Sequence, residues 1–576
     1  MPRKFQGKLH VGRRIQRQKN GDIYVLERTT RYDPATKKTL TVAQRLLGKI
    51  VAGTTEMVPT RRKRAPAPAK DAAPASASRH HTGLTDILEH VGRVSGIDAD
   101  VRGAFPDGGT AEKVLTVARY WLATGGQTLP RLPAWQAMHP TPYPGTISGD
   151  VAGGLFKAVG TDEDGVQRYF RRRAARLDPE ATVAYDSTTV STYSENLHEA
   201  RRGFNKDGDG LETIKLLTLY SVADREPIAF AKQPGNVPDV VSVANALTQL
   251  ESLGLPKALV VTDNGFCSQA NMAEFAARNR KFLTLVDTDE TWVRETIDEL
   301  QDALDGADGV CPFDPGVCGA SKLREGHVLT RARRRARGGR ADGGEETFTR
   351  RLYVHVFRSP DLRAKQEDAF NRRLYEMKTL LERGEDLRAS AQRFADRYMA
   401  VSRTGRGGAA KVAYRNDAVR AARRYFGHFA LATNQPMDTF EALRHYRRRE
   451  RLEEFFGMDK RYFDGRRTRL WSADALRGRQ FVQFVGLGYL GCFRRMLEEA
   501  AEGLGNPRDG ATGDRLKLEK NLKNWLAARS TQDLFDWYDC VETTQVRTEA
   551  GRYRWSTESV RRDALFLERL GMPRPE

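Results

Sequence analysis

A fixed alternation of strand-like and helix-like segments between residues 181 and 287 constrains the fold of this chain most. The runs TVAYDSTTVS, IKLLTLYSVAD and EPIAFAKQ are short and apolar and end in turn signals, so we expect three consecutive strands. A helical segment at residues 239–253, the strand ALVVTD, a helical segment at residues 268–280 and the strand KFLTLVD come next. This order predicts an α/β core in which three strands precede two pairs of a helix and a strand.

Two of these strands end at an aspartate. Asp186 closes the run TVAYD, with STT after it, and Asp263 closes the run ALVVTD, with the turn signal NGF after it. A carboxylate where a buried strand stops lies at the edge of the sheet, where a ligand can reach it. We therefore treat Asp186 and Asp263 as candidate functional residues.

A third candidate carboxylate lies in the stretch HYRRRERLEEFFGMDK, which carries Tyr446, Arg449, Glu453 and Lys460 at the spacing Y-x2-R-x3-E-x6-K. On an α-helix the first three stand at i, i+3 and i+7, so one face presents a hydroxyl, a guanidinium and a carboxylate. Such a face can hold a metal ion and a phosphate side by side. Gly457 is a helix-ending signal before Lys460, and it leaves the place of Lys460 on this face open.

The four spaced residues and the two aspartates resemble the DDE transposases of bacterial insertion sequences, in the branch marked by a Tyr-Arg-Glu-Lys signature. The resemblance covers roughly residues 181–500, and the phrases GFNKDGDG and PGNVPD also look like this family. It implies an RNase H-like catalytic core, whose strand and helix order is the one described above, interrupted by an α+β insertion domain. The fold class we expect is therefore α/β.

The resemblance implies metal-dependent cleavage of the ends of an insertion sequence and strand transfer into target DNA, by a cut-and-paste route through hairpin ends. Asp186, Asp263 and Glu453 would be the catalytic residues and would hold two Mg²⁺ ions, for which Mn²⁺ should substitute. Arg449 would grip a phosphate with two donors, while Lys460 supplies a point charge and Tyr446 a hydroxyl. The partners would be the terminal inverted repeats and target DNA, both double-stranded, with a homodimer in the synaptic complex.

Two other functions stay open from the sequence. One is an RNase H-like nuclease that cuts DNA and does not join it. The other is a catalytically silent DNA-binding protein descended from a transposase, which the presence of all the expected acidic residues disfavours.

The segments outside the α/β core differ in composition. Residues 57–83 are rich in Pro, Ala and basic residues, which is typical of an extended linker, and we assign His80 and His81 to it because no Cys or His follows them closely. We expect a small basic β-rich unit at 1–56, the linker at 57–83, a helical DNA-binding domain at 84–175, the core at 176–287 and 425–505, the insertion domain at 288–424, and a C-terminal helical tail at 506–576.

The charge balance also indicates a polyanionic partner. Lys and Arg total 95 against 75 acidic residues, which gives a net charge of +20. Five cysteines in 576 residues argue against a disulfide scaffold. The chain starts with MPRKFQGKLH, which lacks the apolar core of a signal peptide, and the longest apolar run is too short to span a bilayer. We therefore expect a soluble bacterial protein in the cytoplasm, associated with the nucleoid when it acts.

Overall fold

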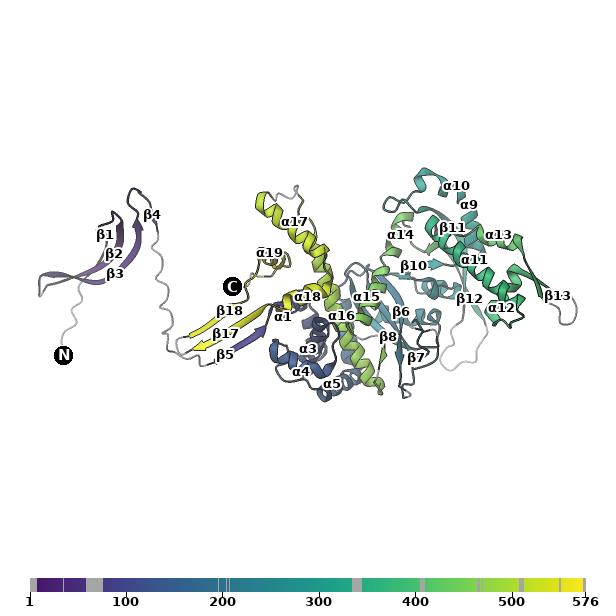
Figure 1. Cartoon of the computed structure of the whole chain (residues 1–576), viewed down its shortest axis with the longest axis horizontal. Coiled ribbons are helices and arrows are strands. Elements are labelled where there is room, and N and C mark those ends of the chain that lie inside the picture. The colour runs from purple at the N-terminus through teal and green to yellow at the C-terminus, as the bar shows by residue number, and fades with distance from the viewer. Residues whose placement is uncertain are drawn as a thin grey trace. The chain divides into compact units, whose positions relative to one another are not determined.

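The computed structural model of the chain describes residues 8–572 with the exception of residues 35, 59–75, 195, 204, 207, 334–343, 404–409, 464–466, 469, 507–511 and 549–550. The chain splits into two compact units (Figure 1). One comprises Met1–Ser78 and Gln545–Arg554, and the other comprises Arg79–Thr544 and Trp555–Glu576. Within the described part of the chain, no helix is both long enough and apolar enough to cross a membrane.

The smaller unit contains an antiparallel sheet with the strand order β1-β2-β3-β4. The carboxylate of Asp22, between β1 and β2, accepts hydrogen bonds from Lys49 Nζ at 3.2 Å and from the Ala52 amide at 3.1 Å. These bonds tie the turn to the end of β3. The sheet lies in the segment for which the sequence predicts a small basic β-rich unit. Its strands are β1 (Leu9–Arg17), β2 (Ile23–Asp33), β3 (Lys38–Ile50) and β4 (Met57–Val58).

The larger unit is built on a mixed sheet with the strand order β11-β12-β15-β10-β9-β6-β7-β8, and β16 pairs with β6 in addition. β7 runs antiparallel to both β6 and β8, whereas β9 runs parallel to both β6 and β10. β15 and β12 continue the sheet beyond β10 in antiparallel fashion. The strands are β6 (Thr182–Thr192), β7 (Glu212–Ser221), β8 (Glu226–Pro234), β9 (Leu259–Thr262), β10 (Lys281–Val286), β11 (Cys318–Ala332), β12 (Glu345–Arg358), β15 (His428–Thr433) and β16 (Arg467–Thr468).

The element order that the sequence predicts for residues 181–287 is confirmed. β6, β7, β8, α7 (Val243–Ser252), β9, α8 (Gln269–Ala277) and β10 follow one another along the chain. β6 is buried from Val183 to the end of the strand, because it lies inside the sheet between β9 and β7. A side chain within β6 is therefore held by a strand with little freedom to move.

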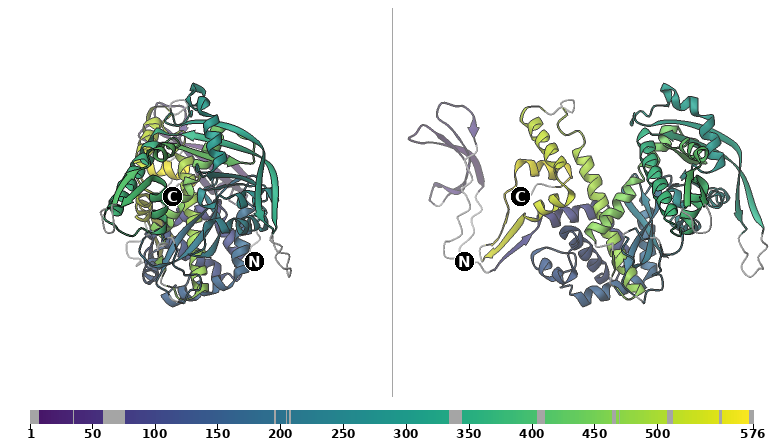
Figure 2. Two further views of the ribbon diagram at one scale, coloured as in Figure 1. Left: turned by 90° about the vertical axis from the view of Figure 1, so that its right-hand side faces the viewer. Right: turned by 45° about the vertical axis from the view of Figure 1, so that its right-hand side comes forward.

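The long helix α16 (Ala473–Ala501) lies between the main sheet and the helices that come before the sheet in the chain (Figure 2). Ser472 is its N-cap, since Ser472 Oγ accepts a hydrogen bond from the Ala475 amide. α16 packs against α3, α5, β8 and α15 (Glu450–Tyr462), and its middle is buried all round. The preceding helices are α1 (Gly83–Val94), α2 (Ile97–Ala104), α3 (Gly109–Thr124), α4 (Leu132–Met138), α5 (Gly149–Thr161) and α6 (Glu163–Ala174).

Buried ion pairs join these helices to the α/β core. Arg119 on α3 donates to Asp98 at 2.7 Å and to the hydroxyl of Tyr489 on α16 at 3.2 Å. Arg173 on α6 contacts both Asp100 on α2 and Glu226 on β8. Each charge is paired, as buried charges must be, and the pairs fix the helices on the core.

The segment predicted to be an insertion domain divides into two parts in the structure. β11 and β12 form an antiparallel pair that extends the main sheet, because β12 pairs with β15. Val354, His355, Val356 and Phe357 are all buried, so β12 is covered on both faces. A second part has a small apolar core of its own, which includes Leu374 and Tyr398. Its elements are α11 (Pro360–Glu382), α12 (Ala389–Tyr398), β13 (Met399–Arg403), β14 (Ala410–Tyr414) and α13 (Asn416–Arg423), and α9 (Thr291–Glu299) and α10 (Gln301–Asp305) precede β11.

The structure differs from the sequence prediction at the end of the linker and in the C-terminal tail. β5 (Ser76–His81) forms a sheet of order β18-β17-β5 with β17 (Glu542–Thr548) and β18 (Gly551–Ser556), where we expected an extended linker and a wholly helical tail. The polar run SASRHH has no apolar alternation, and its partner lies far downstream, so composition could not reveal the pairing. The rest of the linker, residues 59–75, lies outside the described residues. The tail helices are α17 (Gly513–Ala527), α18 (Thr531–Asp539) and α19 (Arg561–Arg569).

Candidate active site

Strand register sets the first two carboxylates side by side. β6 and β9 are parallel neighbours, and Tyr185 of β6 is opposite Thr262 of β9. The residues that follow these two in the chain, Asp186 and Asp263, are therefore neighbours as well. Asp186 still belongs to β6, and its Oδ1 accepts a hydrogen bond from the Ser187 amide at 2.7 Å. Asp263 follows β9 and caps a short 3-10 helix, with Oδ1 accepting from the Asn264 amide at 2.8 Å. Asp186 therefore lies in the middle of β6 and not at the end of a strand, as the sequence predicted, and Asp263 lies beside it where β9 stops.

The signature stretch folds as two helices, whereas the sequence predicted one. α14 (Thr439–Arg447) ends and α15 (Glu450–Tyr462) begins around Arg448 and Arg449. The backbone there stays in the right-handed helical region, but its bonds tighten to i→i−3, as in the Arg449 amide to the Tyr446 carbonyl at 3.0 Å. Gly457 lies inside α15 and does not end it, which settles the question the sequence left open.

Arg449 is the centre of the site, because its guanidinium contacts all three predicted carboxylates. Nη1 lies 3.0 Å from Asp186 Oδ2, while Nη2 lies 3.1 Å from Glu453 Oε1 and 3.5 Å from Asp263 Oδ2. Two strands and one helix therefore bring Asp186, Asp263 and Glu453 together around a single cation, despite the long segment of chain that separates Asp263 from Glu453.

The other two signature residues differ in their distance from this cluster. Tyr446 donates its hydroxyl to Asp263 Oδ1 at 3.0 Å, and the Arg449 guanidinium lies over its ring at 5.4 Å from the ring centre. Lys460 is seven residues beyond Glu453 on the same helix, hence on the same face but about 10 Å further along the axis. Lys460 therefore extends the basic face beyond the carboxylates.

Burial and charge act on the ionisation of the site in opposite directions. Burial raises the pKa of the Asp186 carboxyl above its ordinary value, although the Ser187 amide and the charge of Arg449 counteract it. Burial acts to lower the pKa of Arg449, but nearby negative charges, above all Asp263, outweigh it and raise that pKa. Burial, together with the charge of Asp263, raises the pKa of the Tyr446 hydroxyl, so Tyr446 acts as a neutral donor.

Sequence reasoning missed Lys206, a second cation near Asp186. Its Nζ donates to the Ser187 carbonyl at 2.8 Å, and its positive charge counteracts the rise of the Asp186 pKa. Lys206 lies in the stretch GFNKDGDG, and nothing in the sequence of that stretch shows which strand the lysine reaches. Asp239, from PGNVPD, instead pairs with Lys215 Nζ at 2.7 Å.

The donor set fits hard divalent cations. Three carboxylates supply oxygen atoms only, the ligands that Mg²⁺ and Mn²⁺ prefer. Asp186 Oδ2, Asp263 Oδ2 and Glu453 Oε1 all point at one positive group, the Arg449 guanidinium. Fold and site together define an α/β protein with a three-carboxylate centre suited to phosphodiester chemistry.

Comparison with known proteins gives the family. The family model described as "Transposase DDE domain" matches residues 178–482, more than half of the 576 residues, and the chain belongs to this family. It is therefore a DDE transposase, a class whose members have nuclease and transesterase activity. Among solved structures, it is similar to a piggyBac transposase synaptic complex with hairpin DNA, at 10% identity and a TM-score of 0.32, over 79% of this chain and 82% of that chain. No curated protein matches the chain.

Proposed function

We propose that this transposase cuts the ends of a bacterial insertion sequence and joins them to target DNA, with Asp186, Asp263 and Glu453 as its catalytic carboxylates. The observation that carries the proposal is the convergence of all three on the Arg449 guanidinium, at N–O distances from 3.0 to 3.5 Å. The three carboxylates come from the middle of β6, the end of β9 and a helix far away in the chain, and one oxygen of each faces the same position.

The proposal includes an RNase H-like catalytic core. Its support is the order β8-β7-β6-β9-β10, in which the first three strands are antiparallel and the last two are parallel to β6. The polypeptide between β10 and β15 would be the insertion domain of the resembled branch, with β11 and β12 attached to the sheet.

Asp186, Asp263 and Glu453 would hold two Mg²⁺ ions, with Mn²⁺ as a substitute, and the ions would supply an activated nucleophile and neutralise charge on the leaving oxygen. Asp186 is the buried member of the set and is fixed by the Ser187 amide, so it positions the site. Glu453 is the exposed member, on a helix that begins at a tightened turn, so it can adjust to the DNA.

Arg449 would turn from the carboxylates to a DNA phosphate when other cations neutralise them. Its Nε is buried and has no hydrogen-bond partner among the described residues, so the guanidinium keeps a donor for a phosphate oxygen. Tyr446 would hold Asp263 in place through its hydroxyl and offer the same hydroxyl to a neighbouring phosphate. Lys460 lies further along α15 and would contact the DNA backbone as a point charge.

The same proposal gives the partners and the route. The four signature residues match the Tyr-Arg-Glu-Lys branch, for which cut-and-paste movement through hairpin ends is expected. The net charge of +20 suits binding of the terminal inverted repeats and target DNA. Two ends must meet in the synaptic complex, so we propose a homodimer that acts on the nucleoid in the bacterial cytoplasm.

The test is end cleavage by Asp186→Asn, Asp263→Asn and Glu453→Gln in the presence of Mg²⁺ or Mn²⁺. Each change keeps the size of the side chain and removes a charged ligand, so cleavage should be lost while DNA binding persists. Glu450→Gln, an exposed neighbour at the start of α15, is the matched control and should cleave normally.

Retained end cleavage in all three variants would rule out the proposed site. Insertion of a pre-cleaved end separates a transposase from a nuclease that does not join DNA. DNA binding by the unmodified chain without any metal-dependent nicking would point to the catalytically silent alternative.

A further inference from the structure

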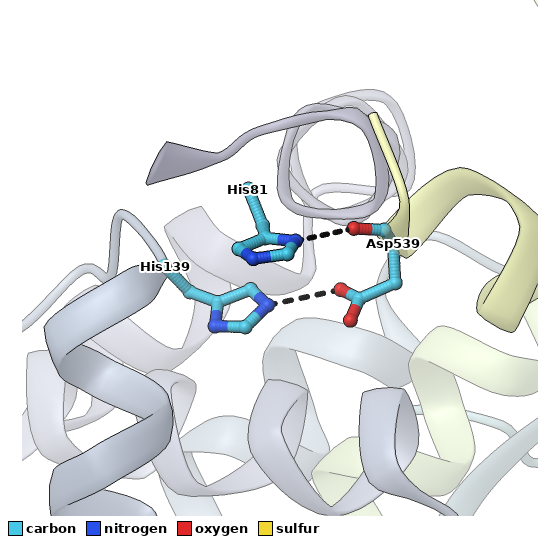
Figure 3. A group of neighbouring side chains, drawn as sticks. All are labelled: His81, His139 and Asp539. Carbon is cyan, nitrogen blue, oxygen red and sulfur yellow. Dashed lines mark hydrogen bonds and ion pairs between the residues drawn. The ribbon is translucent and has the colours of Figure 1, made fainter. Parts of the chain in front are cut away.

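Three side chains from distant parts of the sequence meet in the larger unit, away from the catalytic carboxylates. His81 ends β5, His139 follows α4, and Asp539 is the last residue of α18. One potential ligand atom from each lies within 4.8 Å of those of the other two, and Figure 3 shows the side chains converging. The residues that follow His81 are hydrogen-bonded to a residue that follows Asp539, because the amides of Thr82 and Gly83 donate to the Val541 carbonyl at 2.9 and 3.1 Å. This backbone contact holds His81 and Asp539 near each other.

Both imidazoles are oriented in the way that metal-binding histidines usually are. His81 Nδ1 lies 2.6 Å from the Asp539 carbonyl oxygen, and His139 Nδ1 lies 2.7 Å from the Trp135 carbonyl oxygen. A carbonyl oxygen only accepts, so in each ring Nδ1 must carry the hydrogen. In the neutral imidazole this leaves the lone pair on Nε2, which is the form that binds a metal ion, with a carbonyl as the outer partner.

The His139–Asp539 contact requires a positive charge between the two groups. His139 Nε2 lies 3.0 Å from Asp539 Oδ1, and a lone pair facing a carboxylate oxygen at that distance is repulsive. Either a proton or a metal ion can occupy this position. The second imidazole favours the metal ion, because His81 adds a third potential ligand atom within 4.8 Å of the other two. Trp135 stacks on His139 with the ring centres 4.2 Å apart, which fixes the orientation of the His139 ring.

We propose that His81, His139 and Asp539 bind a structural Zn²⁺ ion. Two imidazoles and a carboxylate form a donor set that binds Zn²⁺ in preference to Mg²⁺. Zn–N and Zn–O bonds of about 2.0–2.1 Å place tetrahedral ligand atoms about 3.3 Å apart, and the His139–Asp539 pair is already close to this spacing at 3.0 Å. Glu542 Oε1, 3.6 Å from His81 Nε2, or a water completes the coordination.

The ion would act as a clip between the two ends of the larger unit. Its ligands come from the start of the unit, from the helices and from the C-terminal segment, so they meet only in the folded chain. Binding free energy is then folding free energy. The clip would hold β5 against β17 next to the existing Thr82–Thr543 hydroxyl contact at 2.8 Å.

The test uses the full chain, dialysed against Mg²⁺ so that the catalytic carboxylates are saturated with the harder ion, and then titrated with Zn²⁺ or Co²⁺. We expect one tightly held Zn²⁺ per chain by elemental analysis, and a visible Co²⁺ absorption band typical of a tetrahedral site. Both should disappear in Asp539→Asn and His139→Asn. His80→Asn, on the opposite face of β5, is the matched control and should keep both signals.

Two further measurements keep the result clear if a variant folds poorly. In the unmodified chain, Zn²⁺ should raise the midpoint of thermal unfolding and a chelator should lower it. Asp263→Asn should retain the Zn²⁺, which separates this site from the proposed catalytic one. Zn²⁺ binding that survives Asp539→Asn and His139→Asn, or that is lost in Asp263→Asn, would overturn the proposal, as would an unmodified chain that binds no Zn²⁺.

Discussion

Arg449→Gln is the perturbation that separates the two roles assigned to the arginine. In the absence of divalent metal, the guanidinium is the group that neutralises the three carboxylates by direct contact. The variant keeps a polar side chain but removes the charge. The metal-free protein should therefore lose stability, and the loss should shrink when Mn²⁺ takes over the neutralisation.

The magnitude follows from the exposure of each partner. The Arg449 and Asp186 side chains are 7% and 11% exposed, and removing one member of a buried pair costs about 3–5 kcal/mol. Asp263 and Glu453 are 39% and 59% exposed, so their pairs contribute only about 0–1 kcal/mol each. We expect a loss of about 3 kcal/mol at alkaline pH, nearly all of it through Asp186.

The loss should become smaller as the pH falls. Burial raises the pKa of Asp186 in the folded state, so protonation favours folding, and that contribution disappears as the pH rises through the folded pKa. Without Arg449 this pKa rises further, and a proton can replace the guanidinium at acidic pH. Destabilisation by Arg449→Gln should therefore grow from acidic to alkaline pH.

The assay is urea unfolding in a chelator, arranged as a double-mutant cycle with Asp186→Asn. The two changes should be strongly non-additive, with a coupling energy toward the upper end of about 0.5–3 kcal/mol. Arg448→Gln, an exposed neighbour, is the control and should stay within about 0.5 kcal/mol of the unmodified chain. An additive cycle, or an Arg449→Gln variant as stable as Arg448→Gln, would refute the central position of the guanidinium.

Three further predictions test other features of the structure. Tyr446→Phe removes the 3.0 Å hydrogen bond to Asp263, worth about 0.5–1.5 kcal/mol, so end cleavage should fall by about 2- to 10-fold in a kinetic assay without loss of folding. Mn²⁺ binding by calorimetry should weaken as the pH falls through the raised pKa of Asp186, because the proton competes with the metal, and Asp186→Asn should remove this dependence. Gly478→Ala should destabilise the chain by about 1–3 kcal/mol in thermal unfolding, because its Cβ would overlap the Phe156 carbonyl where α16 crosses α5, whereas Gly153→Ala, which meets open space, should be neutral or stabilising.

The part of the site that could be predicted from the sequence depends on local signals. In the sequence Asp186 and Asp263 each end a short apolar run, and the register of two parallel strands sets them side by side, although β6 continues past Asp186 to Thr192. Arg449 and Glu453 were selected by spacing, which survives in the structure because the turn at Arg448 keeps a right-handed helical backbone. The tightened hydrogen bonds that divide α14 from α15 leave no trace in residue type.

The features that could not be predicted depend on partners far away in the chain. Only the pairing of β12 with β15 shows that this part of the predicted insertion domain belongs to the main sheet. β5 has no apolar pattern, and its pairing with β17 cannot be seen in either segment alone. His81 looked like a linker residue for the same reason, since His139 and Asp539 reach it only after folding.

Diffraction from crystals of the chain with a DNA end and Mn²⁺, measured at the manganese absorption edge, tests the central claim most directly. The account predicts anomalous peaks between Asp186, Asp263 and Glu453, each within about 2.0–2.3 Å of carboxylate oxygens, and an Arg449 guanidinium turned toward a phosphate. Manganese bound elsewhere, or a Glu453 carboxylate that stays beyond coordination distance while DNA is bound, would contradict it.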